Sequence, residues 1–137
     1  MLGRNALTPD ELAAEPYVLL TTFRKSGDAV STPVWIVDGG DGCLLVTTDG
    51  ASGKVKRIRN GSHVELTPCD VRGRVADDAA VTPATAEILT DPATRAVIET
   101  ALNAKYGLRY KAIRAAGKLR GAEKTSVVVR ITVQPAA

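Results

Sequence analysis

The densest group of charges in the sequence is a basic segment that follows a loop containing two glycines. Residues 49–61 read DGASGKVKRIRNG, and six consecutive positions carry four cations and no acid: Lys54, Lys56, Arg57 and Arg59. The whole chain of 137 residues has a net charge of only +3, so its positive charge is concentrated here. This concentration indicates an anion-binding site, although a solvated helix face also accounts for a short basic run.

The spacing of the apolar residues in this segment predicts an amphipathic helix of about two turns, with Val55 and Ile58 on its buried side. The N-terminus of that helix then contains Ser52, Gly53 and Lys54. A helix N-terminus presents unpaired backbone N–H groups and a partial positive charge, which together make a phosphate site. Arg57, one turn later, is within reach of the same phosphate oxygens. The GxxxxGK[ST] spacing of nucleotide triphosphatases is absent, which argues against that class of enzyme.

Other residue types that carry out chemistry are scarce. Cys43 and Cys69 lie 26 residues apart without a CxxC pair, and His63 is the single histidine. Because these residues match no usual zinc spacing, no metal site is expected. The same sparse set, without a nucleophile elbow, argues against a serine or cysteine hydrolase. Both cysteines are expected to be reduced, partly buried thiols.

Strand-forming segments dominate the rest of the chain. Strands are expected at residues 17–23, 29–37, 43–48, 63–71, 79–89 and 125–133, and the first three are expected to form an antiparallel meander. Pro33 lies inside the second strand and marks a bulge or a sheet edge, because proline donates no ladder hydrogen bond. Helices are expected at residues 8–15, where Thr8 and Glu11 form a capping box, at residues 91–106, where Asp91 is the cap and Pro92 the first helical residue, and within residues 108–117. Six strands with peripheral helices predict one mainly β domain over residues 1–137, a closed or split antiparallel barrel at residues 17–133.

Five segments of the sequence together resemble a known family. They are STPVW (31–35), TTDGASGKVKRIR (47–59), VELTPCDVRGR (64–74), AKYGL (104–108) and VVVRI (127–131). In this order they resemble the split β-barrel flavin and deazaflavin oxidoreductases, the pyridoxamine 5'-phosphate oxidase-like superfamily. Within it, the chain is most similar to the branch that uses the deazaflavin coenzyme F-420. The resemblance spans residues 17–133 and implies a six-stranded antiparallel split β-barrel of the FMN-binding type.

The resemblance also implies where the cofactor lies. Its phosphate is expected against Ser52, Gly53, Lys54 and Arg57, with Lys56 nearby. Its ring system is expected against Thr32, Pro33, Val34 and Trp35, and its phosphoribityl chain beside Thr47 and Thr48. A structural place in the core is the alternative for Trp35. Family members are typically homodimers, so a homodimer in which the second subunit helps to close the site is expected.

The activity that the resemblance implies is hydride transfer between F-420, an 8-hydroxy-5-deazaflavin, and a conjugated or electron-poor small molecule. No catalytic residue is predicted, because the cofactor carries the chemistry; Tyr106 and Tyr110 are either proton donors or barrel-rim packing residues. The alternatives are an FMN-dependent oxidase or reductase, and a non-catalytic carrier of flavin, deazaflavin or haem.

F-420 differs from FMN in its lactyl-oligoglutamate tail, which carries several carboxylates and suits additional cations such as Lys56 and Arg59. A second basic set offers more cations, and solvated surface explains it equally well. This set consists of Arg109, Lys111, Arg114, Lys118 and Arg120.

Composition restricts the remaining partners and the location. Aromatic residues make up only 4% of the chain, too few for the stacking platforms of a barrel that binds single-stranded nucleic acid. The N-terminal residues contain no apolar stretch of signal length, and no apolar run of about 18 residues occurs. A soluble cytoplasmic protein is expected, with a small-molecule substrate and neither a nucleic-acid nor a membrane partner.

Overall fold

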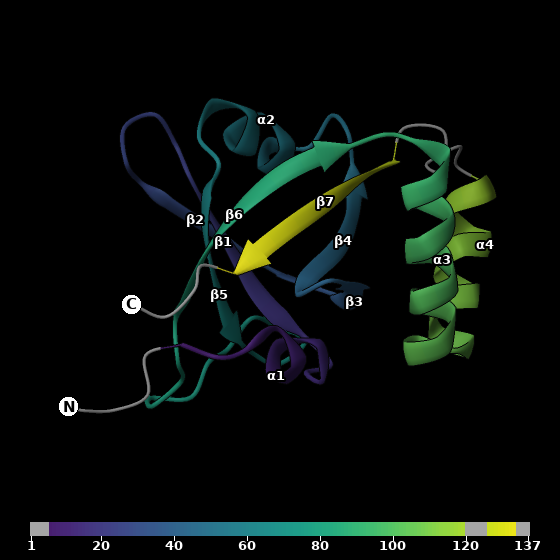
Figure 1. Cartoon of the computed structure of the whole chain (residues 1–137), viewed down its shortest axis with the longest axis horizontal. Helices are drawn as coiled ribbons and strands as arrows, with labels where there is room; N and C mark the ends of the chain where they lie inside the picture. The colour runs from purple at the N-terminus through teal and green to yellow at the C-terminus, as the bar shows by residue number, and fades with distance from the viewer. Residues whose placement is uncertain (1–5, 120–125, 134–137) are drawn as a thin grey trace.

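The computed structural model describes residues 6–119 and 126–133, which fold into one seven-stranded sheet curled into a split barrel (Figure 1). Its strands are β1 (Val18–Phe23), β2 (Ala29–Val34), β3 (Val37–Gly40), β4 (Cys43–Asp49), β5 (His63–Pro68), β6 (Thr82–Leu89) and β7 (Ser126–Val133). Its helices are α1 (Pro9–Ala13), α2 (Gly53–Asn60), α3 (Pro92–Tyr106) and α4 (Leu108–Leu119). The strand order is β2-β1-β5-β6-β7-β4-β3, and every neighbouring pair is antiparallel. The predicted mainly β barrel is confirmed.

The single strand predicted at residues 29–37 is in fact two strands, which brings the number of strands to seven instead of six. β2 pairs only with β1 and β3 only with β4, so the two lie at opposite edges of the sheet and the predicted meander is wrong. The chain leaves the ladder at Trp35 and Ile36, shortly after Pro33. Of the two positions predicted for Pro33, the edge is correct. It pairs with Leu19 in an unbroken register, where no further strand needs its missing N–H.

The other predicted elements are confirmed with shifted ends. Residues 38–42 are expected to lie between strands, but β3 continues to Gly40, so only Asp41 and Gly42 separate it from β4. The strand predicted at residues 63–71 ends at Pro68, and the one predicted at 79–89 begins at Thr82. Thr125, the first residue expected in the last strand, lies outside the described residues.

Aliphatic side chains from most of the strands fill the interior of the barrel: Val18, Leu20, Leu44, Val46, Val64, Leu66, Val129 and Ile131. Leu12 of α1 and Ile58 of α2 belong to the same core. The two helices lie at opposite ends of the barrel, so each closes one end (Figure 1). Val55 and Ile58 are 0% and 4% exposed, which confirms the buried side predicted for the basic helix.

A second core forms where α3 packs on the outer face of the sheet beside β3, β4 and β7. Its members are Val37, Leu45, Ile98, Leu102, Tyr106 and Val128. Asp91 caps α3 as predicted, since its carboxylate accepts a hydrogen bond from the backbone N–H of Thr94 (2.9 Å). Figure 1 shows α3 and α4 side by side on this flank only. Within the described chain, no helix combines the length and the apolar character needed to cross a membrane.

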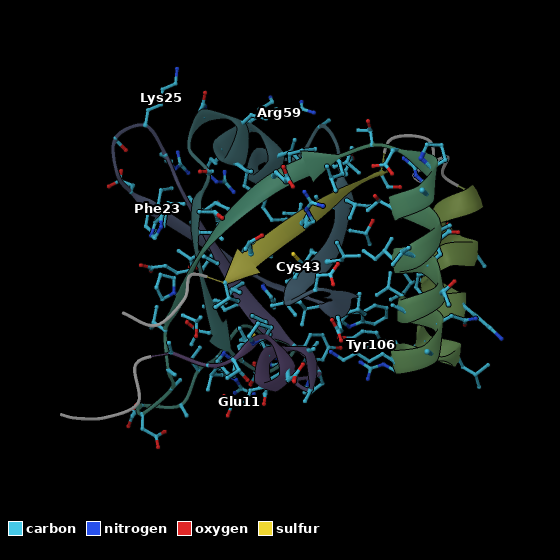
Figure 2. The ribbon with its side chains drawn as sticks, viewed as in Figure 1. Glu11, Phe23, Lys25, Cys43, Arg59 and Tyr106 are labelled. Carbon is cyan, nitrogen blue, oxygen red and sulfur yellow. The ribbon has the colours of Figure 1, made fainter. Side chains whose placement is uncertain are left out.

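The link between the two edge strands is fastened by the C-terminal end of α3. Ile36 is fully buried; its N–H donates to the Tyr106 hydroxyl (3.2 Å), and its carbonyl accepts from the Lys105 ammonium (2.5 Å). Lys105 also donates to the carbonyl of Glu15 (2.6 Å), and Tyr106 to that of Pro16 (2.8 Å). In Figure 2 Tyr106 projects from α3 toward the barrel. These two side chains therefore satisfy backbone groups that no strand partner takes.

The burial of Lys105 predicts a specific dependence of stability on pH. Burial lowers the pKa of Lys105 from 10.5 to about 8, although the charge of Glu15 acts in the opposite direction. Between these two pKa values the unfolded chain binds more protons than the folded one, so the contribution of Lys105 to stability rises with pH. Urea unfolding at pH 7.5, 9 and 10 is expected to show the wild type gaining stability relative to Lys105→Met. A difference that stays constant over this range would contradict the prediction.

Candidate functional site

The loop between β4 and α2 holds the helix N-terminus in the predicted place. Asp49 shapes the loop, since its carboxylate accepts from the N–H of Ala51 (2.9 Å) and its carbonyl from that of Ser52 (3.0 Å). Ser52 is the N-cap, and its hydroxyl accepts from the N–H of Val55 (3.4 Å). Gly53 is the first helical residue. Two backbone N–H groups, those of Gly53 and Lys54, precede the first intrahelical hydrogen bond and point out of the helix end.

Arg57 folds back over this helix end. Its Nε donates to the Thr22 hydroxyl of β1 at 2.6 Å, and Thr22 is itself only 1% exposed. A Cβ atom at Gly53 would lie 2.6 Å from Arg57 Nη1. The guanidinium therefore occupies the space that the missing side chain of Gly53 leaves beside the first turn.

Lys54 adds a second cation to the same turn. Burial and, to a smaller extent, the positive charge of Arg57 lower the pKa of Lys54 below 10.5. No acid lies in the first turn of α2, and neither cation has an ion-pair partner among residues 6–119 and 126–133. The helix end thus combines two close cations with free N–H groups, and an anion bound there would relieve their repulsion.

The predicted residues of β2 face two sides of the sheet, because side chains alternate along a strand. Thr32 lies opposite Leu20 and Val34 packs on the interior core, so both face inward, whereas Pro33 lies opposite Leu19 on the outer face. The Thr32 hydroxyl oxygen is buried without a hydrogen-bond partner among the described residues. Thr32 is also a diagonal neighbour of Thr22 on the inward face, because Thr22 pairs with Val30, two residues before Thr32.

Trp35 belongs to a different group of side chains. Its ring stacks on Tyr106 with the centroids 4.2 Å apart and the planes 9° apart. The Arg109 guanidinium lies 5.8 Å from the Trp35 ring and 5.7 Å from that of Tyr17, whose hydroxyl it contacts. Figure 2 shows Arg59 of α2 and Tyr106 of α3 well apart. The structure therefore does not join Trp35 to the cationic helix end in one compact cluster.

The remaining predicted residues lie around the helix end. Thr47 and Thr48 occupy opposite faces of β4; the Thr47 hydroxyl donates to the carbonyl of Val127 (3.3 Å), and Thr48 continues the inward row of Val46. Lys56 is exposed on α2. In the second basic set, Arg109 covers the aromatic rings described above and Lys111 is exposed, whereas the side chains of Arg114, Lys118 and Arg120 lie outside the described residues.

Sequence reasoning missed Thr22 as part of this site. Thr22 is 35 positions before Arg57 in a strand that reads as ordinary core, VLLTTF. Its only signal is a polar residue at an inward position of a β-strand, which alternation alone marks as unusual. The pairing of Thr22 with Arg57 depends on how α2 is seated on the barrel.

Comparison with known proteins agrees with the fold. The sequence profile described as pyridoxamine 5'-phosphate oxidase matches residues 8–135, nearly the whole chain. The chain belongs to this family. The match confirms the superfamily that the sequence motifs resemble. No curated protein sequence matches the chain.

Several solved structures share the split-barrel fold. The conserved hypothetical protein Rv2991 from Mycobacterium tuberculosis has a TM-score of 0.69 and 17% identity, over 98% of this chain and 87% of the other. An F-420 reductase has a TM-score of 0.63 and 16% identity, over 98% and 97%. HutZ, the haem storage protein from Vibrio cholerae, has a TM-score of 0.65 and 11% identity, over 93% and 88%. The chain spans only 51% of a similar protein of unknown function from Agrobacterium tumefaciens. At these identities the likeness shows the fold alone.

The crowding of Lys54 predicts that its ammonium does not stabilise the fold. Because burial and Arg57 both disfavour its charge, Lys54→Met is expected to leave the free energy of unfolding within about 0.5 kcal/mol of the wild type, or to raise it. The exposed Lys56→Met variant is the matched control. Urea unfolding without ligand measures both. A loss above about 1 kcal/mol for Lys54→Met alone would mean that the ammonium serves the fold instead of a ligand.

Proposed function

We propose that the protein is an oxidoreductase that binds the phosphate of a deazaflavin cofactor, coenzyme F-420, at the N-terminus of α2. The observation that carries this proposal is the uncompensated pair of cations, Lys54 and Arg57, held against a helix end without a nearby ion-pair partner in the described chain. Family membership supports a flavin- or deazaflavin-type oxidoreductase. The family and the site thus point to the same kind of ligand, a phosphorylated cofactor.

F-420 is preferred to FMN because of the charges around the helix end. Both cofactors carry a phosphate, but F-420 continues beyond it into a tail of carboxylates. Lys56 and Arg59 are exposed on the same helix, beyond the phosphate site, and Figure 2 shows Arg59 at the outer surface of α2. Two free cations next to the site suit an extended anionic tail better than a single terminal phosphate. A similar structure that is an F-420 reductase is consistent with this choice.

The bound deazaflavin would supply hydride transfer at its C5 position. The described residues can bind and orient the cofactor: Ser52 and the free N–H groups of α2 direct the phosphate, and Lys54 and Arg57 neutralise it. The buried Thr32 hydroxyl, which has no hydrogen-bond partner among the described residues, fits a polar atom of the ring system. We assign no proton donor, since the Tyr106 hydroxyl is used by backbone groups at Pro16 and Ile36.

Two further ligands remain as alternatives, FMN and haem. For haem the single histidine matters: His63 stacks on Phe23 with ring centroids 5.4 Å apart, and its Nε2 lies 3.6 Å from a Glu65 carboxylate oxygen. Its side chain is 51% exposed at the start of β5. These contacts leave His63 accessible but place it on the outer face of the sheet, away from the buried Thr32 hydroxyl. Haem is therefore the weaker alternative.

Titration with three ligands tests the proposal. F-420 is expected to bind most tightly and, at a hundred times its dissociation constant, to stabilise the protein by about 2.7 kcal/mol, which raises the melting temperature by several degrees. Thermal unfolding and ligand fluorescence measure this with F-420, FMN and haem in parallel. Tighter binding of FMN or haem would select that alternative, and no binding of any of the three would overturn the proposal.

Lys54→Ala is expected to weaken F-420 binding about 10- to 150-fold, because it removes a charge-assisted hydrogen bond to the phosphate. Lys25→Ala is the control, since Lys25 lies exposed in the β1–β2 turn and projects outward from the tip of that turn (Figure 2). Isothermal titration gives both dissociation constants. Equal effects of the two substitutions would show a diffuse electrostatic attraction instead of a localised phosphate site.

We also propose that the protein is a homodimer. The outer faces of β1, β2, β5 and β6 carry no helix among the described elements (Figure 1). The segment between β5 and β6 passes over this side, with Gly73 against Leu19 and Pro33, and it exposes three valines: Val71, Val75 and Val81. Exposed apolar side chains on this side suit contact with a second copy, which would help to close the proposed cofactor site.

Light scattering at micromolar concentration is expected to give twice the chain mass of 14.4 kDa. Val75→Asp should shift the protein toward the monomer, because it places a charge in the proposed interface. Val97→Asp, a change at a similarly exposed valine on α3, should not (45% and 49% exposed). A wild-type protein that is monomeric, or equal behaviour of the two variants, would contradict this interface.

A further inference from the structure

We propose that Thr22 is a positioning residue of the anion site: its hydroxyl holds the Arg57 guanidinium over the first turn of α2, where Gly53 makes room for it. The ligand side of this inference rests on the function proposed above. The geometry at Thr22 stands independently of that function.

The hydroxyl of Thr22 links three elements. It accepts a hydrogen bond from Arg57 Nε at 2.6 Å and donates to the carbonyl of Val30 on β2 at 3.5 Å. Thr22 is 1% exposed and pairs with Val30 near the C-terminal end of β1, so burial and the β1–β2 ladder hold its oxygen in place. The bond uses only Nε of the guanidinium, and both Nη groups therefore remain available as donors to a ligand.

A restraint of this kind is needed because the arrangement is electrostatically unfavourable without an anion. Arg57 lies close enough to Lys54 for its charge to lower the pKa of that lysine. A free arginine side chain has many rotamers and would swing away from a neighbouring cation into water. The bond to Thr22 keeps it in place, and a Cβ atom at Gly53, 2.6 Å from Nη1, would displace it. Thr22 and Gly53 thus preorganise the guanidinium for a phosphate.

Thr22→Val tests this inference, because it removes the hydroxyl and keeps the shape. Thr21→Val is the matched control. Thr21 is the preceding residue of β1, is 8% exposed, and its hydroxyl hydrogen-bonds to that of Ser31 (2.8 Å) on the face of the sheet opposite to Thr22. Thr22→Ser should restore the wild-type behaviour, since it keeps the acceptor. Gly53→Ala is a second route to the same displacement, and alanine favours the helix, so this variant should fold.

The first measurement needs no ligand. The titration of the Lys54 ammonium, followed by NMR of labelled lysine, is expected to move to higher pH in Thr22→Val and Gly53→Ala. In these variants the Arg57 charge is no longer held close to Lys54, so it lowers the pKa of that lysine less. Thr21→Val and Thr22→Ser should titrate like the wild type. If Thr22→Val leaves the Lys54 titration unchanged, Thr22 does not position Arg57 and the inference is wrong.

The second measurement is the affinity for F-420 and for FMN. Thr22→Val should weaken binding about three- to tenfold, as expected for one lost hydrogen bond. It should have no further effect in an Arg57→Ala background, as a double-mutant cycle shows. Equal effects of Thr22→Val and Thr21→Val, or additivity with Arg57→Ala, would overturn the inference while leaving the proposed function intact. If the wild type binds neither cofactor, the proposed function fails, and the Lys54 titration still decides the role of Thr22.

Discussion

The barrel depends on how two residues of backbone are held between β2 and β3. These strands follow one another in sequence yet form opposite edges of the sheet, so the chain must cross between them at Trp35 and Ile36 without ladder partners. Tyr106 and Lys105 of α3 supply partners for the N–H and the carbonyl of Ile36. The cost is the burial of an ammonium group, which is why the pKa of Lys105 falls to about 8. The docking of α3 therefore also satisfies the backbone of the link between the two edge strands.

The same closure shapes the candidate site at the other helix. α2 closes one end of the barrel through Val55 and Ile58, and this places its N-terminus beside the C-terminal end of β1. The apolar side of the helix gains from burial, while its polar side brings Lys54 and Arg57 close together. The burial of the apolar side offsets the repulsion between the two cations. Local electrostatic strain of this kind is common at ligand-binding sites. The helix thus packs on the core with one side and presents the cations of the proposed binding site on the other.

The two outer faces of the sheet differ in what covers them. α3 covers the outer face of β3, β4 and β7 and forms a second core there, whereas the face of β1, β2, β5 and β6 carries loops and exposed valines. This asymmetry leaves the face of β1, β2, β5 and β6 as the surface of the proposed dimer.

The sequence by itself determined the local features: the caps at Thr8 and Asp91, the basic helix with Ser52 at its start, the mainly β composition and the family motifs. These depend on neighbours a few residues apart, which the sequence displays directly. Only the tertiary structure decided that residues 29–37 form two strands at opposite edges, because strand pairing joins segments far apart in the chain. It also decided that Thr22 meets Arg57 across 35 positions and that Trp35 stacks on Tyr106 across 71. Such contacts depend on how α2 and α3 pack against the barrel, and the periodicity of the sequence carries no information about that packing.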